Sequence, residues 1–305
     1  MTLRRFSRRL IAGLLLTLAA APIRAASKVP PFIPMPNSFV QDAAAPFVIS
    51  QKHTFITADT ALLRPAADAL RRVLKERTGM DIALSPKGAK GSITLAIDTA
   101  LHGAEHYRVA VSKKGLAITG ATPAAVFRGV MTLNQLLLAD PHEAERGRIP
   151  AVKIDDAPRF ALRALMIDPA RNFLPVKDVK RFIEVMAKYK YNALQLHLTD
   201  DQGWRIALKS YPQLASPQSY SAADIREIVA YAAEHYIDVI PELDIPGHTA
   251  AFLSVYPELG CTHLQNAPIK VGETVNRMLC AANDTVYTVY NQILREVAAL
   301  FPSQY

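Results

Sequence analysis

The sequence has no apolar run long enough to cross a membrane. Near the N-terminus, LIAGLLLTLAAA covers only residues 10–21, whereas a transmembrane helix needs about 20 apolar residues. Arginines precede this run in RRFSRR, a pattern typical of a signal peptide. We therefore expect residues 1–25 to be a signal peptide cleaved after Ala25, and the mature chain to be exported, periplasmic or secreted, with no stable membrane span. An uncleaved anchor is the alternative, and twin-arginine export stays open.

The sequence also lacks a strong excess of one charge. Its net charge is +8, but five arginines lie in residues 1–25 without any acid, and without them 30 basic residues face 27 acidic ones, a balance of +3. No later basic run is interleaved with aromatic residues. Nucleic acid is therefore not an expected partner.

Cysteine is scarce, with only Cys261 and Cys280 in 305 residues. In an exported chain these two residues form a possible disulfide, which would close a loop worth about 3 kcal/mol on the chain-entropy estimate. Two free buried thiols are the alternative, because the sequence does not give the Cα distance that a bridge requires.

Half of the residues are hydrophobic, so a chain of this length can bury a large core, and we expect two domains. After a Pro-rich linker (26–45), residues 46–158 are predicted to be a small, non-catalytic α+β domain. Residues 46–57 indicate a strand pair and residues 62–79 a helix closed by Gly79. Residues 93–98 and 107–120 indicate three more strands, with a turn at Lys114 and Gly115. A further helix follows from Thr122.

From Arg163 the pattern changes to alternating strands and helices. The predicted strands are RALMID, YNALQLHL and IDVIPELD. The helices are PVKDVKRFIEVMAKY, then SAADIREIVAYAAEH, which Ser221 opens with a capping-box pattern, and NDTVYTVYNQILREVAALF. Alternating units of this kind build parallel sheets, and the fold class is therefore α/β in this part.

The polar residues of these strands lie on one face and gather at the C-terminal ends. In the second strand, Leu194, Leu196 and Leu198 share one face, while Gln195 and His197 lie on the other. A sheet covered by helices on both faces would favour apolar residues on both. We therefore predict a (β/α)₈ TIM barrel, whose chemistry lies at the C-terminal rim, but only its first part, about three βα units over residues 159–305.

The candidate rim residues are carboxylates, histidines and one arginine: Asp168, Arg171, His197, Asp200, Asp201, Glu242, Asp244 and His248. Singly, a rim aspartate can be a helix cap or the partner of a buried arginine, Trp204 can be core packing, and His248 can be a turn residue. Together they indicate a functional site, because burying polar groups is costly without pairing or function. Neither an HxH pair nor an HExxH helix occurs, so we expect no metal and no cofactor, and a metal-dependent hydrolase is the alternative.

Long motifs resemble one known family. RALMIDPARNFLPVKDVKRFIEVMAKYKYNALQLHLTDDQGWRI and DIREIVAYAAEHYIDVIPELDIPGHTAAFLSVYPELGC closely resemble the exo-acting β-N-acetylhexosaminidases of glycoside hydrolase family 20. AVFRGVMTLNQLL and IPAVKIDDAPRF resemble the non-catalytic domain before that family's barrel. The resemblance covers residues 46–305. It implies hydrolysis of terminal non-reducing N-acetylglucosamine or N-acetylgalactosamine residues of glycans, with retention and with assistance from the substrate's own acetamide.

The resemblance also implies roles for the rim residues. Arg171 matches the arginine that binds hydroxyls of the terminal sugar, and Asp200 and His248 match residues that support the general acid. Asp168, His197 and Asp244 are the supporting rim positions.

Two departures from the family pattern affect these expectations. Asn172 stands where the family usually has histidine. The adjacent Asp–Glu pair of the family would follow FPSQY, where this sequence stops. We therefore expect a truncated hexosaminidase that is inactive alone, with an N-acetylhexosamine-binding remnant without catalysis as the alternative.

Overall fold

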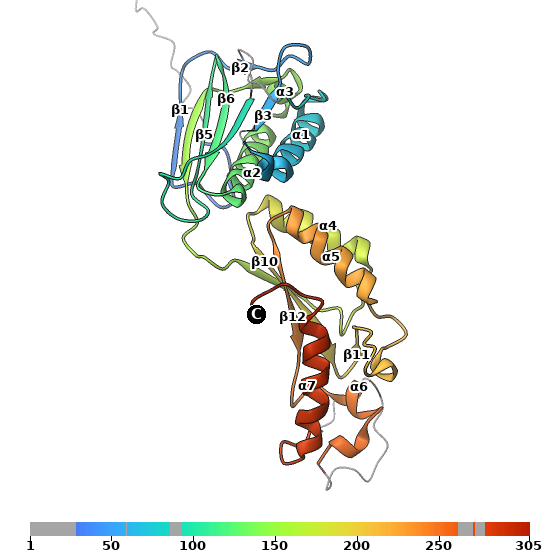
Figure 1. Cartoon of the computed structure of the whole chain (residues 1–305). Helices are drawn as coiled ribbons and strands as arrows, with labels where there is room; N and C mark the ends of the chain where they lie inside the picture. The colour runs from blue at the N-terminus through green and yellow to red at the C-terminus, as the bar shows by residue number, and fades with distance from the viewer. Residues whose placement is uncertain (1–28, 59, 86–92, 262–270, 272–277) are drawn as a thin grey trace, which may run out of the picture.

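The computed structural model describes residues 29–305 except 59, 86–92, 262–270 and 272–277. These residues form an N-terminal α+β unit and a second α/β unit below it in Figure 1. The expected signal peptide, residues 1–25, lies outside the described residues. Within the part of the chain that the structure describes, no helix is long and apolar enough to cross a membrane.

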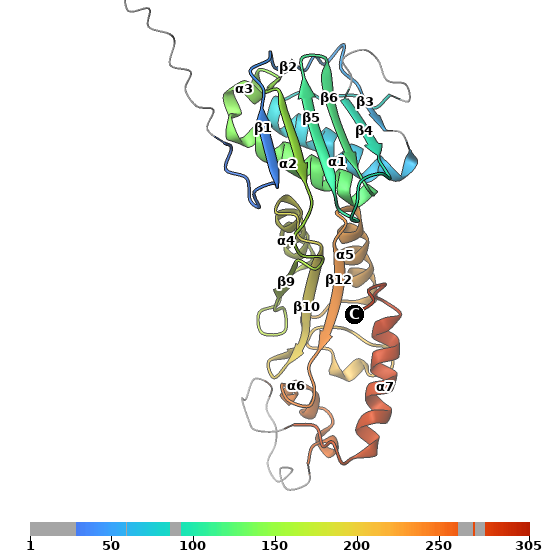
Figure 2. The same cartoon turned by 90° about the vertical axis from the view of Figure 1, so that its left-hand side faces the viewer.

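The N-terminal unit is built on a six-stranded sheet with the order β1-β8-β5-β6-β4-β3. In chain order the strands are β1 (Ser38–Gln41), β3 (Ile56–Ala58), β4 (Ile93–Ile97), β5 (Tyr107–Ser112), β6 (Gly115–Gly120) and β8 (Val152–Asp156). Figure 2 shows α1 (Arg64–Thr78) and α2 (Pro123–Ala139) against one face. Alternate residues of β5 are buried, as expected for a sheet with one covered face.

Smaller elements complete this unit. β2 (Phe47–Val48) and β7 (Arg148–Ile149) form a separate antiparallel pair, α3 spans Pro141–Glu145, and a 3-10 turn at Ala61–Leu63 precedes α1. The predicted helix ends are confirmed. Gly79 ends α1 in the left-handed conformation with φ 72°, and the Thr122 side chain accepts a hydrogen bond from the backbone of Ala125 at the start of α2.

Three expectations for this region were wrong. The segment 26–45 is not only a linker, because β1 lies in it and pairs antiparallel with β8. The two strands expected in 46–57 form but do not pair with each other: β2 pairs with β7, and β3 with β4. The turn between β5 and β6 is formed by residues 113 and 114, one residue earlier than predicted, since Ser112 faces Gly115. Edge strands and long-range pairings leave little local pattern to detect.

The second unit contains the three predicted parallel strands, with β10 (Ala193–Asp200) between β9 (Ala164–Ile167) and β12 (Asp238–Leu243). A short strand, β11 (Gly203–Trp204), turns back antiparallel onto the end of β10. The helices are α4 (Val176–Lys188), α5 (Ala222–Glu234), α6 (Ala250–Leu253) and α7 (Asp284–Ala298), with 3-10 turns at Pro212–Leu214 and Pro257–Leu259. The Ser221 capping box is present at α5.

The core of this unit lies between the sheet and its helices. Leu194, Leu196 and Leu198 of β10 are fully buried, as are Val179 of α4 and Ile225 of α5. Figure 1 shows α4 and α5 side by side. The predicted division of β10 into an apolar and a polar face is therefore confirmed, and its polar face is free to build a site.

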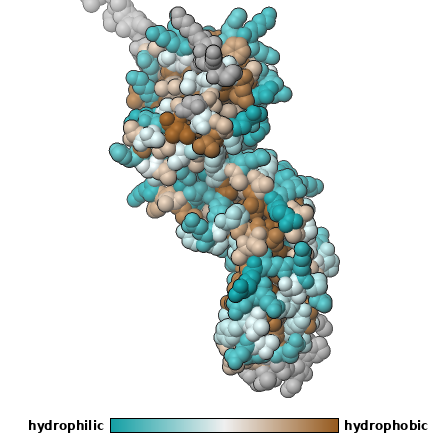
Figure 3. Space-filling model, viewed as in Figure 1, coloured by the Kyte–Doolittle hydropathy of each residue, from teal (hydrophilic) through white to brown (hydrophobic). Residues whose placement is uncertain are grey.

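The sheet of the second unit is open. Among the described residues, β9 and β12 each pair only with β10, so the strands do not close into a barrel. Met166 of β9 and Val185 of α4 remain exposed, at 52% and 51%. Figure 3 shows hydrophobic residues on the surface of both units. Open edges and exposed apolar side chains favour association with other chains.

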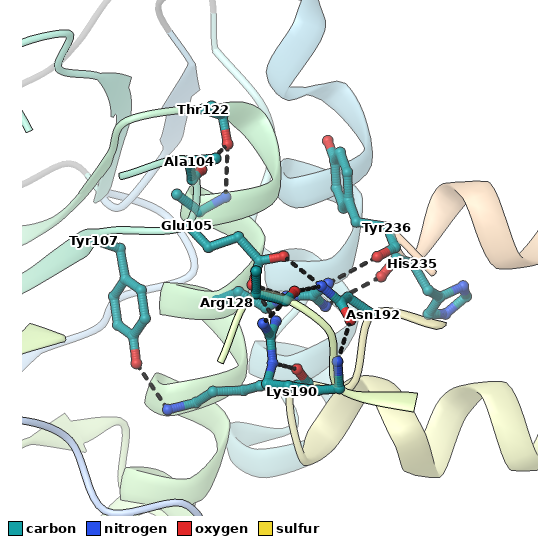
Figure 4. A network of polar contacts seen from close by, with 12 residues as sticks. Ala104, Glu105, Tyr107, Thr122, Arg128, Lys190, Asn192, His235 and Tyr236 are labelled. Atoms are coloured by element: carbon teal, nitrogen blue, oxygen red, sulfur yellow. Dashed lines mark hydrogen bonds and ion pairs between the residues drawn. The ribbon is translucent and has the colours of Figure 1, made fainter. Parts of the chain in front are cut away.

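The two units meet at a buried polar network, shown in Figure 4. Arg128 of α2 is 1% exposed, and its Nη2 and Nη1 atoms donate to the carbonyl oxygens of Tyr236 (2.7 Å) and His235 (3.3 Å). The carboxylate of Glu105 binds Arg163 and, at 3.4 Å, the amide of Asn192. Arg163, Asn192 and Tyr236 precede β9, β10 and β12, so these contacts fix the N-terminal ends of all three strands.

A second part of the joint contains a buried ion pair. Lys190 Nζ lies 3.1 Å from Asp156 Oδ2 and 2.8 Å from the Tyr107 hydroxyl. All three side chains are buried. Burial lowers the pKa of Lys190, although Asp156 opposes this shift. The N-terminal unit thus holds the base of the sheet through paired charges, and the opposite ends of the strands carry the candidate site.

Candidate active site

The candidate site lies at the C-terminal ends of the parallel strands, as predicted. Asp168 follows β9, Asp200 ends β10 and Asp244 follows β12. Because parallel strands bring their C-terminal ends to one edge, residues far apart in sequence meet there.

Asp200 is the centre of the site. It is 1% exposed, and its Oδ2 lies 2.9 Å from His197 Nε2 and 2.5 Å from Arg171 Nη2. Its Oδ1 lies 3.1 Å from His248 Nδ1 and accepts the backbone N–H of Asp201 at 2.6 Å. Burial alone would raise the pKa of the Asp200 carboxyl, but the hydrogen bonds, that from His197 first, outweigh it and lower the pKa. Asp200 is therefore held as an anion.

Arg171 is anchored on its inner side and exposed on its outer side. Its Nη1 donates to Asp168 Oδ2 at 2.6 Å, and its backbone N–H donates to Asp168 Oδ1 at 3.0 Å. With Asp200 on Nη2, both terminal nitrogens are fixed by carboxylates, while 40% of the side chain stays exposed. The hydrogen bond with Asp168 raises the pKa of the guanidinium. The fork is pre-oriented at the open rim.

His197 bridges two carboxylates inside the sheet. Beyond Asp200, its Nδ1 lies 2.9 Å from Glu242 Oε1, and the side chain of Gln195 donates to Glu242 Oε2 at 2.7 Å. Burial would lower the pKa of the imidazole, but the hydrogen bond with Asp200 and the neighbouring carboxylate of Glu242 outweigh it and raise the pKa. The two acids on either side of the ring thus favour the protonated form of His197.

Asp244 and His248 follow β12 and form the part of the rim next to that strand. The backbone N–H of Asp244 donates to the Thr199 hydroxyl at 3.0 Å, and burial raises the pKa of its carboxyl. His248 has a positive φ of 55° and a side chain that is 53% exposed. It is therefore more than a turn residue, because its ring contacts Asp200 from the solvent side.

Two rim residues have structural roles instead. Asp201 Oδ1 accepts the backbone N–H of Ala250, the first residue of α6. Trp204 is 1% exposed and packs its ring on Phe252, with ring centroids 5.7 Å apart. The alternative reading of each, a helix cap and core packing, is therefore the correct one.

Sequence reasoning missed the role of Arg205. Its guanidinium donates to the carbonyl oxygens of Pro169 (2.9 Å) and Ala170 (2.9 Å) in the loop that carries Arg171. The only signal was its position next to the candidate rim loop. Arg205 thus supports the loop that carries Arg171.

Two groups of three ligand atoms lie within 4.8 Å of one another and could hold a metal ion among the described residues: His197, Glu242 and Asp244, and Asp200, Asp244 and His248. However, both ring nitrogens of His197 face carboxylates and both oxygens of Asp200 accept hydrogen bonds. A metal ion would have to displace these contacts. The donor set therefore fits a hydrogen-bond network better than a metal centre.

Cys261 and Cys280 lie on neighbouring backbone segments. The backbone N–H of Cys280 donates to Leu259 O at 2.9 Å, and Gly260 forms a bridge with Leu279. Both cysteines are free thiols in this structure. The hydrogen bond with Cys280 raises the pKa of the Cys261 thiol. The expected disulfide is not formed here, but the two side chains are placed beside each other.

Comparison with known families gives two consecutive matches. Residues 29–157 match "Glycosyl hydrolase family 20, domain 2", and residues 160–305 match "Glycosyl hydrolase family 20, catalytic domain". The beta-hexosaminidase of Porphyromonas gingivalis is 33% identical over 293 residues, which cover 90% of this chain and 38% of that protein. The beta-hexosaminidase of Vibrio furnissii is 36% identical over 222 residues, covering 65% of this chain and 36% of that protein. The chain thus spans less than half the length of these relatives.

Solved structures agree with these matches. The GH20 beta-N-acetylhexosaminidase of Streptomyces coelicolor has a TM-score of 0.81 and 37% identity, covering 90% of this chain and 58% of that one. A mutant Streptomyces plicatus beta-hexosaminidase in complex with its product GlcNAc has a TM-score of 0.81 and 36% identity, covering 90% and 57%. The two-unit arrangement described above is therefore similar to that of these solved GH20 structures.

Proposed function

The chain belongs to glycosyl hydrolase family 20, and from this premise we propose that it acts on terminal non-reducing N-acetylhexosamine residues of glycans. The observation that carries the proposal is the anchored fork of Arg171 at the open rim, held by Asp168 and Asp200. A pre-oriented guanidinium with an exposed outer side can donate to neighbouring sugar hydroxyls at little entropic cost. The similar Streptomyces plicatus protein was solved with GlcNAc, which supports this substrate class.

The reaction proposed for the family site is substrate-assisted hydrolysis with retention. The oxygen of the sugar's 2-acetamido group attacks the anomeric carbon, the leaving oxygen takes a proton from a general acid, and water later opens the oxazolinium intermediate. Binding must favour the oxocarbenium-like transition state. Excess negative charge in the rim, from Asp168, Asp200, Glu242 and Asp244 against Arg171 and His197, would stabilise that developing positive charge.

Asp200 and His248 are proposed to support the general acid. His248 places Nδ1 against the anionic Asp200, so in the neutral imidazole Nδ1 carries the proton and Nε2 is an acceptor at the exposed side of the ring. An acceptor there can receive a hydrogen bond from a carboxylic acid and keep it protonated until the leaving oxygen needs the proton. Asp168, His197 and Asp244 are proposed as supporting residues, and the site of action as periplasmic or secreted.

The first test is sugar binding by the polypeptide of residues 26–305. We expect N-acetylglucosamine to bind saturably in isothermal titration, and Arg171→Met to weaken binding at least tenfold, because each hydrogen bond from a charged donor contributes about 1.5–3 kcal/mol. Arg181→Met is the matched control, since Arg181 lies on α4 with a side chain that is 80% exposed. Equal binding by Arg171→Met and Arg181→Met would contradict the assignment of Arg171.

The second test separates binding from catalysis. The 305 residues contain no adjacent Asp–Glu pair of the kind that the family resemblance requires. We therefore expect residues 26–305 to bind the sugar without turning over a chromogenic N-acetylglucosaminide. Release of the chromophore above the rate of the Arg171→Met variant would overturn that expectation and place the general acid among the residues present.

A further inference from the structure

Glu242 contributes to the negative charge of the site, but none of the residue roles described above accounts for its contact with His197. We propose that Glu242 is a positioning residue: it holds His197 as an imidazolium, which fixes Asp200 and, through Asp200, the sugar-facing Arg171. This role rests on the proposed function, because it matters only if Arg171 binds the sugar. In the described structure the polar contacts of Glu242 are with His197 and Gln195 and not with Arg171, so it acts through His197 and Asp200.

A continuous chain of contacts carries this role. β10 and β12 are neighbouring parallel strands in which His197 faces Glu242 directly. The Gln195 amide fixes one Glu242 oxygen at 2.7 Å, and the other oxygen lies 2.9 Å from His197 Nδ1. On the opposite side of the ring, His197 Nε2 lies 2.9 Å from the same Asp200 oxygen that Arg171 contacts.

The geometry favours the doubly protonated ring of His197. A neutral imidazole has one nitrogen with a lone pair, and here that nitrogen would face a carboxylate oxygen at 2.9 Å. The side chain is 5% exposed, so water has little room to relieve the repulsion. Protons on both nitrogens let the ring face a carboxylate oxygen on each side, and although burial opposes it, these contacts raise the pKa of His197.

Other charged groups surround this chain and enter any titration of it. They are Asp168 after β9, Arg171 in the same loop, Asp244 after β12 and the exposed His248. None of them contacts His197 Nδ1, where Glu242 is the partner in the described structure. Removing the charge of Glu242 should therefore affect the proton on Nδ1 first. The resulting lone pair would loosen the hold of His197 on Asp200.

The direct test is Glu242→Gln, which keeps the shape of the side chain. With ¹⁵N-labelled histidine, we expect the His197 ring in the unaltered chain to titrate above the ordinary histidine range, and Glu242→Gln to lower that pKa by about one unit or more. Gln195→Leu should also lower the pKa of His197, but by a smaller amount than Glu242→Gln. In isothermal titration, Glu242→Gln should weaken N-acetylglucosamine binding about three- to tenfold.

Glu227→Gln is the matched control, because Glu227 lies on α5 with a side chain that is 54% exposed and pairs only with Lys180 in the described contacts. It should change neither measurement. If Glu242→Gln leaves both the His197 titration and the sugar affinity unchanged, the proposal is wrong. If the unaltered chain binds no sugar, the proposed function fails separately. In that case the titration of the His197 ring alone tests the role of Glu242. A lower His197 pKa in Glu242→Gln supports the contact between Glu242 and His197 as the cause, and an unchanged pKa overturns the proposal.

Discussion

Replacing Arg128 by methionine should destabilise both units of the chain. The substitution keeps an unbranched apolar side chain in α2 but removes the donors to Tyr236 O at 2.7 Å and His235 O at 3.3 Å. It also removes the weaker contact between Arg128 and Glu105, whose atoms lie 3.5 Å apart. Glu105 still pairs with Arg163 in the variant. Each charged hydrogen bond contributes about 1.5–3 kcal/mol, and the new apolar contacts offset part of the loss, so we expect about 3 kcal/mol in total.

Urea unfolding followed by two probes measures this effect. Far-UV circular dichroism reports on both units, whereas Trp204, the only tryptophan, is buried in the second unit and reports on that unit alone. Because Arg128 ties α2 to the segment before β12, Arg128→Met should move both transitions to lower urea. Arg146→Met, whose side chain is 72% exposed, should move neither. A Trp204 transition that stays in place in Arg128→Met would refute the reasoning that the N-terminal unit stabilises the second.

Three further outcomes are expected. Under oxidising conditions Cys261 and Cys280 should form a disulfide, which mass spectrometry detects as the loss of two hydrogens. The Cys261→Ser variant should not lose these hydrogens and should give a single mass. The stabilisation that the protonated His197 provides should be complete below about pH 6.5 and should be lost as the pH rises through its raised folded pKa. The difference in urea midpoint between the unaltered chain and His197→Gln should therefore shrink at high pH. A difference that stays constant with pH would contradict this expectation. Gly120→Ala should cost about 1–3 kcal/mol in urea unfolding, because its Cβ would lie 2.6 Å from the backbone nitrogen of Val126. An unchanged midpoint would show that the backbone yields there.

Local pattern was enough to predict the three parallel strands and the three long helices of the second unit. The alternation in β10 separates Leu196 from His197, and in the structure Leu196 belongs to the hydrophobic core whereas His197 contacts Glu242. The helix caps at Thr122 and Ser221 were equally local and were confirmed. Helix caps that depend on three or four consecutive residues were therefore predicted correctly, whereas the equally local turn between β5 and β6 was misplaced by one residue.

Features that depend on distant partners could not be predicted in this way. β1 is a mostly exposed edge strand without an apolar alternation, and only its pairing with β8 defines it. Arg128 is the only charged residue of α2, and a lone arginine in a helix usually indicates an exposed position. It is buried because two carbonyl oxygens from the loop before β12, more than a hundred residues away, accept its hydrogen bonds.

The joint and the candidate site lie at opposite ends of the same strand, which makes their effects separable. From Asn192 to Asp200 the chain advances eight residues, about 26 Å at roughly 3.3 Å per residue. Substitutions this far apart with no shared partner usually add. Arg128→Met should therefore lower stability without changing the sugar affinity of the folded protein, and Arg171→Met should lower the affinity, with the double variant showing the sum of the two stability changes. A stability change in the double variant that departs from this sum by more than about 0.5 kcal/mol would mean that β10 transmits strain from the joint to the rim.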